Sequence, residues 1–170
     1  MRDDGLMLAF GFGTFHAVVL TLVLLLPLYL TTDLGEALAE LNTAAGLAVF
    51  AALWATSVYC TRRALLQAGS ERRDGMPAPL LSNGIVWGGW NGVLFFWCLF
   101  VAGVLALLVI RIGEDGLGQV AGILVFGITA WGVGTVLSAI VGGAVGFVFA
   151  LLDMLLLATG RWVAEESPIK

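Results

Sequence analysis

Two ionisable side chains lie inside long apolar runs of the 170-residue sequence and are the first candidates for chemistry. His16 is the only histidine, and Asp153 is the only one of the 20 charged residues (12 acidic plus 8 basic) within such a run. An imidazole can gain or lose a proton near pH 7, and a carboxylate in hydrocarbon must be protonated, paired or hydrated. The two residues predict either a satisfied structural contact or a proton-relay or substrate site inside a membrane.

An internal repeat relates the histidine to a third polar residue. Residues 12–18 align with 87–93 at an offset of 75, and residues 45–50 align with 121–126 at an offset of 76. Two matches at nearly one offset predict a duplicated two-helix unit with a pseudo-two-fold axis along the membrane normal. The alternative is composition alone, because the chain is rich in Gly, Ala and Val.

Depth in the membrane connects the three polar residues. Under the repeat, His16 and Asn91 lie at the same depth, about 9 Å from the inner membrane face at 1.5 Å per residue. The imidazole is then expected to donate to neighbouring backbone or to Asn91. If the last apolar run forms two helices, Asp153 lies at a similar depth, so a His16–Asp153 pair is geometrically allowed.

Small residues recur every four positions in the later apolar runs. Spacing by four keeps them on one helix face, where the absence of large side chains lets two backbones approach closely. They predict packing inside a helix bundle, or a face for self-association or for a partner subunit. The predicted packing residues are Gly84, Gly88, Gly92, Gly134, Ser138, Gly142 and Gly146.

Motifs for other chemistry are missing from the sequence. It contains no glycine-rich phosphate loop with lysine, no Cys/His metal cluster, no HExxH and no Ser/His/Asp set. We therefore expect no enzyme activity, no metal and no cofactor; a bis-histidine haem site would need a second chain. The net charge of −4 and the pI of about 4.7 argue against nucleic-acid binding, which requires a basic face.

Composition predicts the fold class. The chain is 60% hydrophobic and 12% charged with a mean hydropathy of +1.01, whereas soluble domains carry about 25% charged residues. We expect an all-α, polytopic helical membrane bundle over residues 1–170. It forms a single integral membrane domain in the cell membrane, with the lipid bilayer as its main partner.

The number of spans depends on the last apolar run. Because about 20 helical residues cross a bilayer, the first three runs fit one helix each. The run 119–160 would make a rod of about 63 Å, so we expect a hairpin turn at Gly142-Gly143. This predicts five transmembrane helices at about 6–30, 41–60, 85–110, 119–141 and 144–161. The alternative is four spans plus a re-entrant segment.

Arginines predict the orientation. Four of them, in or beside the predicted loop 61–84, place that loop and the N-terminus in the cytoplasm. Five spans would leave five basic residues inside and three outside, whereas four spans would leave seven inside and one outside. Charge favours four spans and helix length favours five. We follow length, so we expect the C-terminus outside.

Two functions fit these features. The first is a non-catalytic membrane subunit or oligomer-forming protein, either a homo-oligomer or bound to a partner membrane subunit through its small-residue faces. The alternative is a small transporter or channel that uses the intramembrane polar residues His16, Asn91 and Asp153. One acid and one histidine are few ionisable groups for coupled transport, although a homodimer would contain two of each.

Overall fold

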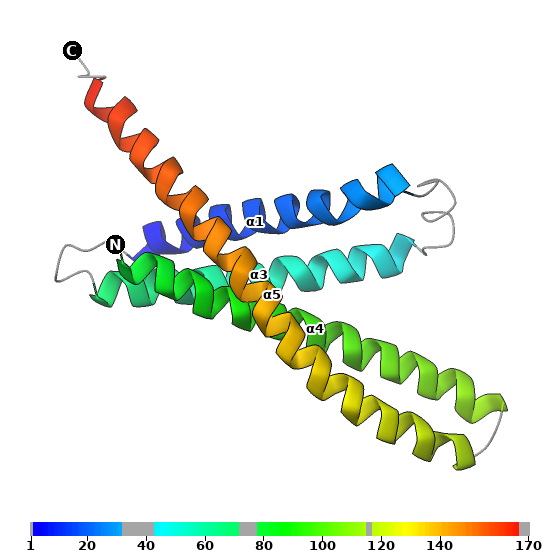
Figure 1. Ribbon diagram of the computed structural model, residues 1–170. Coiled ribbons are helices and arrows are strands. Elements are labelled where there is room, and N and C mark those ends of the chain that lie inside the picture. Colours follow the sequence, from blue (N-terminus) through cyan, green and yellow to red (C-terminus); the bar gives the residue numbers. More distant parts are fainter. Residues whose placement is uncertain (1, 32–42, 72–77, 115–116, 167–170) are drawn as a thin grey trace.

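The described residues of the computed structural model, 2–31, 43–71, 78–114 and 117–166, are all helical. They form four helices, named as in Figure 1: α1 (Arg2–Thr31), α3 (Thr43–Glu71), α4 (Ala78–Glu114) and α5 (Leu117–Glu166). Helices are favoured in such apolar runs because every backbone hydrogen bond is made within the segment. The all-α prediction is confirmed for this part of the chain.

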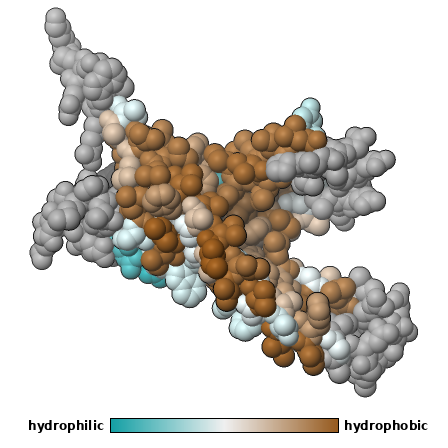
Figure 2. Space-filling view, in the orientation of Figure 1, coloured by the Kyte–Doolittle hydropathy of each residue, from teal (hydrophilic) through white to brown (hydrophobic). Residues whose placement is uncertain are grey.

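Within the described residues, four helices are long and apolar enough to cross a membrane, rather than the five predicted. Their apolar segments are Leu6–Leu26, Thr43–Gln67, Leu81–Val109 and Val125–Thr159. Large hydrophobic side chains are exposed along all four helices, and Figure 2 shows a largely hydrophobic face. This surface is compatible with a membrane protein.

The predicted turn at Gly142-Gly143 is wrong, and so is the division into helices 119–141 and 144–161. α5 is one continuous helix of 50 residues, about 75 Å long, so the re-entrant alternative fails as well. The length argument assumed that a helix stands upright and ends at the membrane surface. A turn in hydrocarbon would leave backbone groups unpaired, whereas the continuous helix pairs them.

The glycines at this position serve the crossing of α4 and α5. A β-carbon added at Gly88 would lie 2.5 Å from the carbonyl oxygen of Gly142 and 2.5 Å from Cα of Gly146. One added at Gly84 would lie 2.6 Å from Cβ of Ala150. The two backbones touch because these positions carry no side chain.

Three other predicted packing residues lie along the same helix pair. A β-carbon at Gly92 would collide with the carbonyl oxygen of Ser138, and one at Gly134 would collide with the ring of Phe96. The structure therefore places all seven predicted packing residues between α4 and α5. Gly134 differs from the others because it accommodates an aromatic side chain rather than a backbone.

The helices form two antiparallel pairs, α1 with α3 and α4 with α5, and α3 also packs on α4 (Figure 1). The pairs converge toward the end where α1 begins and diverge toward the ends that precede residues 32 and 115. α1 begins and α5 ends at the same end of the molecule. The side of the membrane on which the chain ends stays a prediction.

The predicted cytoplasmic loop is much shorter than 61–84, because α3 continues to Glu71 and α4 begins at Ala78. Pro79 fits the first turn of α4, where its missing N–H has no intrahelical partner to lose. Arg62 and Arg63 are exposed on α3, and Arg63 lies 5.5 Å above the ring of Tyr59. Arg72 and Arg73 lie outside the described residues.

The closest contact within the α1–α3 pair lies at a different repeat position from the closest contact within the α4–α5 pair. A β-carbon at Gly13 would lie 2.6 Å from Cα of Val58, so α1 and α3 cross there. The repeat relates Gly13 to Gly88 and Val58 to Gly134, yet Gly88 lies against Gly142 and Gly146 instead. The internal repeat therefore remains a sequence-based prediction.

Candidate functional site

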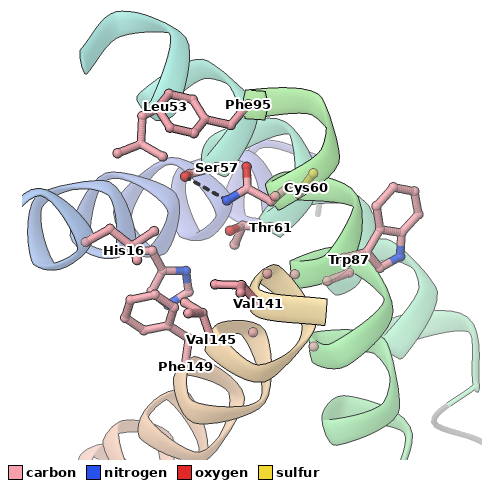
Figure 3. Close-up of a pocket in the computed structure, with 18 of the residues that line it drawn as sticks. His16, Leu53, Ser57, Cys60, Thr61, Trp87, Phe95, Val141, Val145 and Phe149 are labelled. Carbon is pink, nitrogen blue, oxygen red and sulfur yellow. Dashed lines mark hydrogen bonds between the residues drawn. The ribbon is translucent and has the colours of Figure 1, made fainter. Parts of the chain in front are cut away.

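A cavity of about 540 Å³ lies where the four helices converge, and every helix contributes to its wall (Figure 3). Ligand pockets in proteins have volumes of about 300–1,000 Å³, so the cavity is large enough for a small molecule. His16, Asn91 and Asp153 all line it. The structure thus brings the three predicted polar residues of α1, α4 and α5 to one cavity.

His16 and Asp153 touch. Nε2 of His16 lies 3.1 Å from Oδ1 of Asp153. With the proton on Nε2, the imidazole donates a hydrogen bond to the carboxylate; if both groups are charged, the contact is an ion pair. The side chains are 11% and 17% exposed, so each provides most of the polar environment that the other needs.

Aromatic rings hold the imidazole in place. His16 stacks on Phe149, with ring centroids 4.3 Å apart and planes 25° apart (Figure 3). The rings of Phe12 and Phe15, from the same helix, lie 6.4 and 6.0 Å away. Through Asp153 and Phe149, the single histidine joins α1 to α5 across the cavity wall.

The expectation that His16 donates to Asn91 is not met. Nδ2 of Asn91 donates instead to Oγ of Ser57 on α3 at 3.2 Å (Figure 3). Oδ1 of Asn91 is buried and has no hydrogen-bond partner among the described residues. Of the partners that the sequence allowed, Asp153 is the one that His16 contacts.

Two buried polar residues of the cavity were missed from the sequence. Ser57 is 2% exposed, and Asn83 is 9% exposed with its Nδ2 unpaired within the described structure. Ser57 lay inside a predicted span but looked unremarkable, because a serine hydroxyl can bond to its own helix. Asn83 lies two residues before the predicted start of the third span, so it was assigned to a loop; a span boundary drawn one turn earlier would have found it.

Tryptophan side chains provide further polar contacts between helices. The indole N–H of Trp54 donates to Thr14 at 3.0 Å, joining α3 to α1, and that of Trp97 donates to Thr135 at 3.0 Å, joining α4 to α5. These bonds satisfy indole groups that would otherwise be unpaired in apolar surroundings. They lie outside the cavity and strengthen the two helix pairs.

Metal ligands do not cluster in the part of the chain that the structure describes. No three His, Cys, Asp or Glu side chains there are placed to hold one ion. Cys60 lines the cavity, whereas Cys98 is exposed, and neither forms a disulfide. The chemistry of the cavity therefore rests on the His16–Asp153 pair and on the amide and hydroxyl groups around it.

These features define a class: small all-helical proteins with four apolar helices, compatible with a membrane, that surround a cavity containing an acid–histidine pair. The chain belongs to a family of unknown function, DUF7965, whose model matches residues 7–169. The match includes every residue of the cavity. No curated protein and no solved structure matched the chain.

Proposed function

We propose that the protein is a small multi-pass transporter of the cell membrane, and that His16 and Asp153 form the proton-responsive part of its pathway. The observation that carries this proposal is the 3.1 Å contact between the two side chains in the wall of a cavity shared by all four helices. Ionisable groups at membrane depth are costly, and they usually face a cavity where they serve ions, protons or substrates.

The pair has the chemistry that proton coupling needs. A proton taken up by either side chain changes the charge of the cavity wall and the strength of the His16–Asp153 contact. A ligand that donates a hydrogen bond to the carboxylate stabilises its charged form. Ligand occupancy and proton occupancy are therefore linked, and the link joins α1 to α5.

The test is proton flux into vesicles that contain the purified protein. An entrapped pH-sensitive dye reports acidification after an external pH jump, with protein-free vesicles as the baseline. Asp153→Asn and His16→Gln keep hydrogen-bonding groups but remove the acid or the imidazole, so we expect each to reduce flux at least tenfold. Thr129→Val, on the exposed surface of α5, is the matched control and should retain flux.

Two results would contradict the transporter. Wild-type flux no greater than that of empty vesicles would remove the proposal. Undiminished, equally pH-dependent flux in both Asp153→Asn and His16→Gln would make the pair a structural link only. Circular dichroism of each variant shows whether a loss of flux comes from unfolding.

A second candidate, a non-catalytic subunit or oligomer-forming protein, is favoured by glycines outside the α4–α5 crossing. A β-carbon at Gly103, Gly122 or Gly132 would meet no atom of the described structure within 4 Å. Such positions allow another helix to approach closely. Purification from native membranes in mild detergent, followed by mass spectrometry, distinguishes a partner subunit from a homo-oligomer; a monomer without partners excludes both.

The orientation proposed for this transporter places the N-terminus in the cytoplasm. Arg62 and Arg63 lie four to five residues before the end of the apolar segment Thr43–Gln67 of α3, and α3 ends at the same end of the molecule at which α1 begins (Figure 1). Arginines near span ends favour the cytoplasmic side. The converging end of the bundle then faces the cytoplasm.

A further inference from the structure

Most of the polar side chains that line the cavity lie closer to the converging end of the bundle than most of its large apolar side chains do. On α1, His16 precedes Leu20, Val23 and Leu24. On antiparallel α3, Ser57 and Thr61 follow Leu53, although Leu65 lies still closer to the converging end and departs from the pattern. The sorting is therefore a property of the cavity rather than of one helix.

The α4–α5 pair repeats this pattern. On α4, Asn83 and Asn91 precede Phe95 and Leu99, and on α5 the apolar positions precede Asp153. Ser138 is polar and lies toward the apolar end, but its hydroxyl donates to a carbonyl oxygen of its own helix at 3.0 Å. Ser138 therefore offers no free donor to the cavity.

Two amide groups in the polar half lack partners. In the described structure, Nδ2 of Asn83 and Oδ1 of Asn91 are buried and make no hydrogen bond, although Asn83 is 91% buried (9% exposed). A buried polar group without a partner costs free energy. One group offers a donor and the other an acceptor, and they lie eight residues, or about 12 Å, apart along α4.

We infer that the cavity binds an amphipathic molecule, with an uncharged hydrogen-bonding head among the asparagines and an apolar chain along the diverging end. Because the two groups are about 12 Å apart along α4, a hydroxyl head binds one of them at a time, and it accepts a hydrogen bond from Nδ2 of Asn83. Leu20, Leu53 and Phe95 provide the apolar surface for the chain. The binding site stands on these observations, whereas the role of the bound molecule as a transported substrate rests on the proposed function.

The molecule enters from the side, between the two helix pairs. Figure 1 shows the pairs separating toward the apolar half, and Figure 2 shows the surface hollowed between them. Val23 and Leu24 are each 58% exposed there while also lining the cavity. The apolar wall therefore continues into the outer hydrophobic surface, which gives an apolar chain a path without crossing water.

The probe for this inference is hexadecanol with a diazirine in its chain and a terminal alkyne. The purified full-length protein in phosphatidylcholine vesicles is photolabelled with this alcohol or with the same chain lacking the hydroxyl, and the labelled residues are mapped by mass spectrometry. We expect the alcohol to label Leu20, Leu53 and Phe95 at least fivefold more than the alkane does. Exposed Leu105, outside the cavity, should react equally with both.

Substituting an asparagine tests whether the head group of the ligand binds to the amides. Asn83→Ala should lower cavity labelling by roughly fivefold, the effect of one typical hydrogen bond, and the Thr129→Val control should not change it. Unlabelled hexadecanol should compete, whereas hexadecane should not. If Asn83→Ala unfolds, this competition on the wild-type protein still tests the head group.

Equal labelling by alcohol and alkane, or labelling spread evenly over the exposed helix faces, would overturn the inference. Cavity labelling without proton flux would retain this binding site and reject the transporter, and flux without labelling would do the reverse. Such an amphipathic molecule could be a membrane lipid or a free amphiphile. Analysis of the lipids extracted from protein purified from native membranes distinguishes these two sources. A bilayer lipid displaced by hexadecanol identifies a membrane lipid, and a displaced single-chain compound identifies a free amphiphile; either supports the site.

Discussion

The substitution Gly88→Ala tests whether the α4–α5 crossing depends on direct backbone contact. The added β-carbon would lie 2.5 Å from the carbonyl oxygen of Gly142 and 2.5 Å from Cα of Gly146. Favourable separations between carbon atoms are about 3.5–4.0 Å, so the helices must move apart by about 1 Å. Both obstacles are backbone atoms and cannot rotate away.

The size of the effect follows from two opposing contributions. Overpacking a closely packed contact costs about 1–3 kcal/mol, while replacing glycine by alanine inside a helix gains about 0.5–1 kcal/mol. Gly103→Ala supplies the second contribution alone, because the described structure has no atom within 4 Å of that added carbon. The difference in unfolding free energy between the two variants is therefore expected to be about 1–3 kcal/mol, with Gly88→Ala the less stable.

Reversible unfolding in mixed micelles with increasing sodium dodecyl sulfate, followed by circular dichroism, provides the assay. Both variants lie on α4 and make the same chemical change, so their difference cancels the effect of helix preference. If Gly88→Ala proves as stable as Gly103→Ala, the two helices do not cross in contact at this position. The interpretation of Gly142-Gly143 as a close helix crossing rather than a turn would then be wrong.

Two further predictions concern the acid–histidine pair and the side on which the chain ends. A double-mutant cycle of His16→Ala and Asp153→Ala, measured by the same unfolding assay, should give a favourable coupling of about 0.6–1.7 kcal/mol, the range for hydrogen bonds between membrane helices; zero coupling would deny the contact a role in stability. Reporter proteins fused to the N-terminus and to the C-terminus should report the same side of the membrane, because four crossings return the chain to its starting side. Opposite sides would show that one helix does not cross.

The sequence contains enough information to predict the helical, apolar character of the chain, because that depends on local composition. Long runs without charge can satisfy their backbone only as helices in an apolar medium. The isolation of His16 and Asp153 in such runs also marks them as candidates, since polar groups there need a partner. None of this requires knowing which helices are neighbours.

Tertiary structure decided the role of the glycines and the identity of the polar partners. Gly142-Gly143 fits either a turn or a close helix crossing, and the choice depends on whether an opposing glycine such as Gly88 lies within reach. His16 had several partners open to it, and only the oblique path of α5 brings Asp153 to 3.1 Å. Asn83 acquires meaning in the same way, because burial by neighbouring helices, rather than its position in the chain, turns an amide near a span end into part of a cavity.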